Sequence, residues 1–395
     1  MSEGCGSVLI AAISGRALAH AASKAGYAPL VADFFADADT QSLSENTVKM
    51  TSPIACGFQW EVLEPALDAL AAGAPSPLLG LVYGSGFEDR PALLEKIAAR
   101  WRMLGNDAAT IAQVSDPEVF FATLDRCKIA YPKTQMCPPV NLAGWLVKRA
   151  GGAGGSHIQA TQRAGNHAAE GDVYYQTLVR GRSISAVFAA NGQHARVLGF
   201  SEQWTAPAPD KPWRYGGALQ PAILSSRAAE KMADIVRVLS DAFALCGLNT
   251  ADFILDGDTP LLLEINPRPG ATLDIFDNAS TPFFAAHIDA VLHGSLPAHA
   301  PVFDDVSASA IVFAPENLVI PSGIDWPKEA ADLPKPGERI DKEQPICTLH
   351  SRADSAEAAK RSLRLQHDNL LTMLETAEPI SPEEEEDHRT LRRKQ

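Results

Sequence analysis

One stretch of this sequence is more informative than any other: Leu261-Leu262-Leu263-Glu264-Ile265-Asn266-Pro267-Arg268-Pro269-Gly270. Successive side chains of a strand point to opposite faces, so Glu264, Asn266 and Arg268 share one face while the residues between them enter the core. Pro267 cannot donate to a strand ladder and marks the strand's edge or end. Carboxylate and amide oxygens two residues apart suit Mg²⁺, and an arginine beside them suits phosphate or carboxylate. The alternative interpretation is a strand end followed by a Pro-rich turn with incidental polar residues.

The preceding strand tests the metal-site interpretation through its register. We expect strands over residues 251–255 and 261–266. If the loop between them is centred on Asp258, Asp252 lies opposite Glu264, about 5 Å away, which suits a bridging cation. If Asp256-Gly257 forms a two-residue turn, Asp252 faces Leu261 instead and the interpretation fails. Because the proline at position 260 cannot donate to the ladder, we favour the wider loop.

Composition narrows the class of protein. The 395 residues suffice for two or three domains, and 46% hydrophobic with 21% charged residues is ordinary for a soluble protein. With a net charge of −14 and no basic stripe, the chain is not expected to bind nucleic acid. No run of 18 apolar residues occurs, so we expect no membrane partner and a cytoplasmic location. The six cysteines include no C-x-x-C pair, which argues against a structural zinc site or a disulfide framework.

The amino-terminal residues predict a β-α-β opening. Strands over 8–13, 29–32 and 78–82 alternate with helices that end at Gly26 and span 61–72. Open α/β sheets bind ligands at the carboxyl ends of their strands. The candidate substrate residues at these ends are Ser14, Gly15, Asp33 and Asp37, whose acids could attract an amine. Capping and turn roles explain the same acids equally well.

A second motif joins a lysine to a glycine-rich loop. The segment 145–156 is predicted to be a strand that carries Lys148 and then a loop with Gly151, Gly152, Gly154 and Gly155. Backbone N–H groups of such a loop can approach an anion closely, and Lys148 is placed to reach the same phosphates. The spacing is not that of a P-loop, and a flexible surface hairpin would look similar.

The remaining elements complete the expected order. Strands over 172–179 and 183–189 are predicted to form a hairpin, and a helix over 228–246 is predicted to end at Gly247. Strands over 308–313 and 346–349 precede a helix over 354–374. Residues 376–395 are charged and are expected to be disordered.

Taken in this order, the motifs resemble the ATP-grasp superfamily over residues 7–375. The resemblance implies two lobes that close over ATP, with Lys148 on the phosphates and the glycine loop covering them. It makes Gln176-Thr177-Leu178-Val179 the hinge whose backbone binds adenine. It assigns two magnesium ions to Asp252, Glu264 and Asn266, and it gives Arg268 the role of stabilising a reacting acyl phosphate.

The opening Ser14-Gly15-Arg16 with the acids from Asp33 to Asp39, and the ending 337–348, look like a narrower branch. This branch comprises predicted carboligases related to biotin carboxylase, found in methanogens and methylotrophs near genes for one-carbon carrier cofactors. Two positions depart from the superfamily pattern. The usual Asp-Lys near the start of the second domain is Asp116-Pro117, and the usual hinge acid is Thr177.

The resemblance implies a mixed α/β and α+β fold. We expect a Rossmann-like domain over 1–106, a small lobe over 107–178, a large lobe with the metal site over 179–306, a β-rich carboxyl-terminal subdomain with a terminal helix over 307–375, and the tail over 376–395.

The implied activity is that of an ATP-dependent carboxylate-amine ligase acting through an acyl phosphate. It would add an amino acid such as glutamate to a methanofuran- or tetrahydromethanopterin-type precursor. Two alternatives stay open: a biotin-carboxylase-like carboxylase and a non-catalytic nucleotide-binding protein. The expected partners are small-molecule carboxylate and amine substrates, together with a second copy of the chain in a homodimer.

Overall fold

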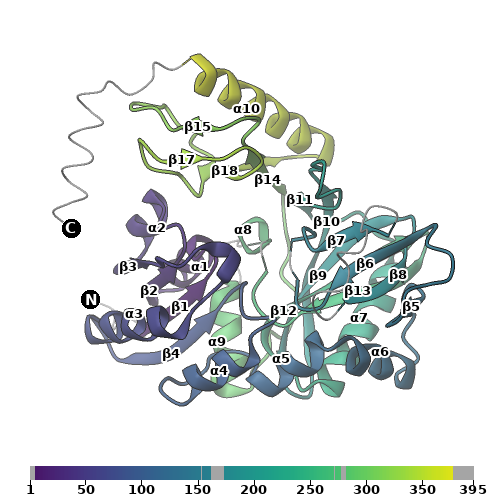
Figure 1. Cartoon of the computed structure of the whole chain (residues 1–395). Helices are drawn as coiled ribbons and strands as arrows, with labels where there is room; N and C mark the ends of the chain where they lie inside the picture. The colour runs from purple at the N-terminus through teal and green to yellow at the C-terminus, as the bar shows by residue number, and fades with distance from the viewer. Residues whose placement is uncertain (1–4, 153, 162–172, 271, 277–281, 377–395) are drawn as a thin grey trace.

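The computed structural model describes residues 5–152, 154–161, 173–270, 272–276 and 282–376 (Figure 1). The amino-terminal elements are β1 (Ser7–Ala12), α1 (Arg16–Lys24), β2 (Ala28–Asp33), α2 (Ala38–Leu43), β3 (Asn46–Lys49), the 3-10 helix η1 (Ile54–Cys56), α3 (Trp60–Ala72), β4 (Leu78–Tyr83) and α4 (Pro91–Ala98). The strands form a parallel sheet in the order β3-β2-β1-β4. Every residue of β1 is buried, as expected of a central parallel strand. The predicted β-α-β opening is confirmed.

Two helices and a small sheet follow. The helices are α5 (Ala108–Ser115) and α6 (Pro117–Arg126), and the strands are β5 (Thr134–Gln135), β6 (Trp145–Arg149), β7 (Ile158–Ala160) and β8 (Val173–Thr177). Asp116 caps α6 by accepting from the N–H groups of Glu118 and Val119, and Pro117 fits the first helical position. The four strands form a sheet in the order β5-β8-β6-β7.

The largest sheet has the order β13-β12-β9-β10-β11-β14-β18-β16, and all of its pairs are antiparallel. Its strands are β9 (Arg182–Asn191), β10 (Ala195–Thr205), β11 (Tyr215–Gln220), β12 (Cys246–Asp256), β13 (Thr259–Asn266), β14 (Val306–Phe313), β16 (Ala330–Ala331) and β18 (Pro345–Ala353). The helices α7 (Ser226–Ala242), α8 (Leu273–Phe276) and α9 (Phe283–His293) accompany it, and β15 (Leu318–Val319), β17 (Arg339–Ile340) and α10 (Ala356–Thr376) complete the chain.

The core clusters group the elements differently from the expected domain limits. The apolar side chains of α5 and α6 pack with α7 and the large sheet, although we expected both helices in the small lobe. The carboxyl-terminal strands β14 and β18 extend the large sheet and carry their own core with α10. Figure 1 shows this subdomain, in green and yellow, on the far side of α8 from α9.

Three sequence expectations were wrong, and the third concerns the loop between β12 and β13. The predicted hairpin does not form, because β8 belongs to the small sheet and β9 to the large one. The helix predicted to end at Gly247 ends at Ala242, and Ala244 adopts φ 51° before β12 begins at Cys246. The tail expected over 376–395 starts with a helical Thr376, and 377–395 lie outside the described residues.

The register of β12 and β13 joins a tight turn to a bulge. Asp256 pairs with Thr259, so the turn holds only two residues and the expected wide loop is wrong. The register then shifts at Leu263, and Asp252 pairs with Glu264. Pro260 is tolerated because β13 is the edge strand of the sheet. The predicted pairing of the two acids is therefore confirmed through a different backbone route.

Among the described residues, no helix combines the length and apolar character needed to cross a membrane.

Candidate functional site

The acids of β12 and β13 form the centre of the site. Asp252 and Glu264 are paired across the two strands, and the Asn266 amide donates to Asp252 Oδ2 at 3.2 Å. On its other side Asp252 pairs with Ser185 of β9. The geometry brings together the three side chains that the sequence assigned to magnesium.

The charge state of Asp252 shows why a cation fits here. Burial, and then the neighbouring Glu264 carboxylate, raise the pKa of Asp252 to about 7. Its Oδ1 is buried and has no hydrogen-bond partner. A divalent cation would satisfy this oxygen and offset the repulsion between the two acids. Two acids and one amide leave further coordination positions for water and phosphates.

Lys148 faces this acid pair from the small sheet. It is 2% exposed, and burial lowers its pKa while Glu264 and Asp252 act in the opposite direction. Tyr174, its neighbour across β6 and β8, has its pKa raised by burial and then by Glu264. The expected strand-lysine arrangement is present, with the lysine directed at the candidate metal ligands.

Arg268 is held between the strand and the amino-terminal domain. Its Nε donates to Glu88 Oε1 at 2.7 Å and its Nη2 donates to Asn266 Oδ1 at 3.2 Å. Burial alone would raise the pKa of Glu88, but the ion pair with Arg268 holds it below its ordinary value. The guanidinium is therefore fixed beside the acid pair by a residue that the sequence analysis missed. Glu88 follows β4, at the strand edge where ligands were expected.

The glycine loop lies against two other parts of the chain. A Cβ on Gly151 would stand 2.9 Å from the Asp89 side chain, and one on Gly155 would stand 1.9 Å from the Trp213 carbonyl oxygen. Tyr215 N–H also donates to the Gly154 carbonyl at 2.9 Å. The remaining loop glycine, Gly152, packs on the His157 ring. Glycine is needed here because backbone and side chains approach the loop closely.

The expected hinge has part of its backbone already bonded. Gln176 is 1% exposed and its amide donates to Thr134 inside the small sheet. The N–H groups of Thr177 and Leu178 donate to the carbonyls of Lys133 and Gly144. Val179 lies in the link between β8 and β9. Adenine recognition by this segment stays a prediction.

The candidate substrate residues of the amino-terminal domain divide into two groups. Asp33 is fully buried and accepts N–H bonds from Gly15, Phe35 and Ala36, which holds the loop after β2 in place. Ser14 donates to Asp332 at 3.3 Å. Asp37 is 6% exposed and its Oδ2 has no partner, while burial and the surrounding acids raise its pKa to about 8. Of the candidate acids, Asp37 has the greater capacity left for a ligand.

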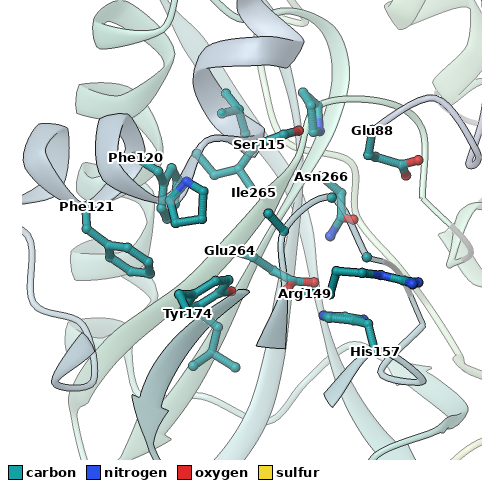
Figure 2. A pocket seen from close by; sticks show the side chains of 17 residues that line it. Glu88, Ser115, Phe120, Phe121, Arg149, His157, Tyr174, Glu264, Ile265 and Asn266 are labelled. Atoms are coloured by element: carbon teal, nitrogen blue, oxygen red, sulfur yellow. The ribbon is translucent and has the colours of Figure 1, made fainter. Parts of the chain in front are cut away.

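Figure 2 shows the pocket beside the acid pair, where Glu264 and Asn266 extend toward Arg149 and His157. Phe120, Phe121 and Tyr174 close its other side. Arg149 is exposed and was not singled out from the sequence, although it directly follows Lys148 on β6. Alternation along a strand would put Arg149 on the face opposite Lys148, but Arg149 is the last residue of β6 and the backbone turns after it.

Comparisons with known proteins bear on the family and the fold of the chain. Residues 115–272 match the family model described as an ATP-grasp domain. An uncharacterized protein of Methanocaldococcus jannaschii is 26% identical over 174 residues, which is 44% of this chain. The match spans 41% of that relative, so the chain covers less than half of its length.

Three solved structures resemble almost the whole chain. The ADP complex of N5-carboxyaminoimidazole ribonucleotide synthetase has a TM-score of 0.68 at 14% identity, covering 95% of this chain and 100% of its own. Biotin carboxylase from Campylobacter jejuni, in a β,γ-ATP complex, has a TM-score of 0.70 at 14% identity, covering 97% and 96%. L-amino acid ligase from Bacillus licheniformis has a TM-score of 0.70 at 13% identity, covering 93% and 98%. At these identities the likeness establishes the ATP-grasp fold, and the predicted fold class is confirmed.

Proposed function

We propose that this protein is an ATP-dependent ligase that activates a carboxylate as an acyl phosphate and joins it to an amine. One observation carries the proposal: Asp252, Glu264 and Asn266 converge opposite Lys148, beside an arginine and under a glycine loop. Such a site neutralises and positions a triphosphate, which phosphoryl transfer needs more than a covalent nucleophile. The solved structures that share the fold include an amino acid ligase and a biotin carboxylase.

Each residue has a defined task in this proposal. Lys148 and the loop N–H groups would bind the phosphates, and Arg268, held by Glu88, would neutralise the carboxylate whose oxygen attacks the γ-phosphorus. The terminal phosphoryl group moves to that oxygen and ADP leaves. The amine nitrogen, as the free base, then attacks the acyl carbon, and phosphate leaves with the former carboxylate oxygen and with the proton that the amine releases. Asp252, Glu264 and Asn266 would hold two magnesium ions, which supply charge neutralisation on the phosphates.

The volume of the pocket beside the acid pair bears on how ATP would bind. It is about 60 Å³, which is room for a few waters. We propose that the small sheet moves away from β13 to admit a triphosphate. Arg149, at the rim of this pocket, supplies a cation where the usual second nucleotide lysine is replaced by Asp116-Pro117.

The test is ADP release from MgATP with a pool of carboxylates and amines. We expect Glu264→Ala to abolish turnover while its thermal unfolding midpoint stays within a few degrees of the parent. Asp256→Ala, an exposed acid at the far end of the same hairpin, is the matched control and should keep full activity. Turnover retained by the Glu264 variant would refute the assignment of the site.

The finer proposal concerns the product. We propose that the acceptor belongs to a methanofuran- or tetrahydromethanopterin-type cofactor pathway and that the added group is an amino acid such as glutamate. The sequence resemblance at both ends of the chain supports it. We place the enzyme in the cytoplasm as a homodimer. Mass spectrometry of cell extract incubated with ATP should reveal a product heavier than its precursor by one glutamyl unit.

A second candidate reaction is the carboxylation of an amine, with bicarbonate as the phosphoryl acceptor. The likeness to biotin carboxylase over 97% of the chain favours it. An absolute requirement for bicarbonate in ADP release, with no response to organic acids, would select this reaction over the first.

A further inference from the structure

A second cavity lies apart from the nucleotide pocket. It measures about 350 Å³, within the range of small-molecule sites. Its walls come from α1 and α2, from α8, and from the strands β14, β16 and β18. Figure 1 shows α8 between the amino-terminal domain and these strands, so three parts of the chain meet around the cavity.

The wall formed by α8 presents an ionised carboxylate. The Asp274 side chain is 10% exposed and accepts from the Arg16 guanidinium. Its Oδ1 is buried without a hydrogen-bond partner, as is Nε2 of His350, which lies 3.4 Å from Oδ2. Burial alone would raise the pKa of Asp274, but the Arg16 guanidinium and then the neighbouring His20 and His350 hold it well below its ordinary value. Asp274 therefore offers a ligand a negative charge and a hydrogen-bond acceptor, Oδ1, that has no partner.

The balance of charge selects a cation. Arg16 is the buried cation of this wall, and three carboxylates surround it: Asp274, Asp332 at 2.9 Å and Asp39 at 3.7 Å. The carboxylates at this wall therefore outnumber its guanidinium. An anion would meet net repulsion at this wall, whereas a primary ammonium could donate to Asp274 and offset the charge.

The rim of the cavity has the opposite character. Lys328 and Arg352 are exposed and line the opening, together with a single acid, Glu329. A carboxylate carried on the same ligand would meet a net positive charge there. The cavity is thus polarised, with an acidic wall and a basic rim.

The α8 wall of the cavity also packs against the large sheet, at β11 and β14. Tyr215 of β11 is partly buried, and the pKa of its phenol is raised by burial, then by Asp252 and, to a lesser degree, by Asp274. The cavity therefore belongs to the face of the large sheet that also carries β11.

We infer that this cavity is the site of the amine substrate and that it takes an aminocarboxylate, with the ammonium group at Asp274 and a carboxylate at Lys328 and Arg352. The assignment of this ligand as the reacting amine rests on the proposed function. Binding itself does not, because it needs no nucleotide.

Calorimetric titration of the full chain without ATP tests the inference with three matched probes. L-glutamate carries both groups, glutarate lacks the ammonium, and butylamine lacks the carboxylates. We expect L-glutamate to bind most tightly, butylamine more weakly, and glutarate not at all. Equal binding of glutarate and L-glutamate, or no binding of L-glutamate, would overturn the proposal.

Two variants separate the wall from the rim. Asp274→Asn should lower the affinity for both L-glutamate and butylamine by about tenfold or more, since a charge-assisted hydrogen bond is lost. Lys328→Glu, at an exposed position, should lower the affinity for L-glutamate several-fold and leave the affinity for butylamine unchanged. This variant therefore tests the cavity even if Asp274→Asn does not fold. An unchanged L-glutamate affinity in Lys328→Glu would overturn the assignment of the rim. Glu64→Gln, which alters a distant surface ion pair, is the control.

MgATP binding is measured in parallel on the same protein. Failure of MgATP to bind, with the L-glutamate series intact, would remove the proposed function but not the amine site. The reverse pattern would remove the amine site alone.

Discussion

The buried ion pair between Glu88 and Arg268 should be the strongest single link between the amino-terminal domain and β13, the strand that carries two of the candidate metal ligands. Their side chains are 10% and 8% exposed, and Nε and Oε1 lie 2.7 Å apart. Glu88 Oε2 also accepts from the N–H groups of Gly86 and Phe87. Glu88→Gln can keep those two bonds only by turning an amide N–H toward the guanidinium. We expect it to lower the free energy of unfolding by about 3–5 kcal/mol, because a buried cation loses its partner.

A double-mutant cycle isolates the pair from the rest of the site. Arg268→Met should also destabilise, since Glu88 would remain ionised with only backbone donors. The loss in free energy of unfolding of the double variant should be smaller than the sum of the two single-variant losses by about 1–3 kcal/mol. Urea unfolding followed by tryptophan fluorescence gives each value. Losses that simply add would refute the claim that these groups act as a unit. Asp68→Asn, at an exposed partner of Arg100, should leave the unfolding midpoint unchanged.

The sign of the pH effect gives an independent check. The folded pKa of Glu88 lies below its ordinary value of 4.5, so the folded state releases its proton more readily than the unfolded chain. The stabilisation is present above pH 4.5 and is lost as the pH falls through the folded pKa. The difference between the parent and Glu88→Gln should therefore shrink in acid.

Four further predictions follow from the described geometry. Asp37, with its pKa raised to about 8, holds an extra proton in the folded state, so stability should fall as the pH rises from about 4 to 8, and Asp37→Asn should flatten thermal midpoints over that range. His287 accepts from Leu248 N–H and donates to the Leu104 carbonyl, and its pKa is lowered to about 4. The stability of the fold should therefore decrease as the pH drops from 6.5 to 4. His287→Ala should remove this pH dependence and lower the free energy of unfolding in urea by roughly 2–4 kcal/mol. Gly155→Ala, at φ 73° and with its Cβ 1.9 Å from the Trp213 carbonyl oxygen, should displace the glycine loop, raise the KM for ATP about tenfold in steady-state assays and lower the melting temperature. Arg149→Gln should raise that KM by a similar factor, roughly tenfold, without destabilising the fold, because the side chain is exposed.

Local sequence patterns were sufficient to predict the elements whose own residues carry a recognisable pattern. The acid pair followed from period-two alternation in β13, and Lys148 followed from its place before the glycines. Even so, the route to the pairing of Asp252 and Glu264 was wrong. A two-residue turn plus a bulge at Leu263 gives the same partners as a wide loop, and alternation alone cannot distinguish these two solutions.

Residues that act through distant partners carried no local signal. Glu88 gains its role from Arg268, 180 positions later, and Asp274 gains its role from Arg16, 258 positions earlier. The hairpin expected around Gly181 failed for the same reason. Two neighbouring strands looked like one unit, but they complete different sheets through partners that lie elsewhere in the chain.

The distribution of buried contacts indicates which part of the molecule moves when ATP binds. The amino-terminal domain is joined to the large sheet by buried polar bonds, including Asn106 to Asn249 at 2.7 Å and His287 to the Leu104 carbonyl at 2.9 Å, and by a shared apolar core. The small sheet has a core cluster with only Val147 and Tyr175 as its buried members among the described residues. Separating the first interface would expose a large apolar surface and several unsatisfied polar groups, whereas moving the small sheet disturbs much less of either. If the 60 Å³ pocket opens to admit a nucleotide, we expect the small sheet to move and the cavity at α8 to keep its shape.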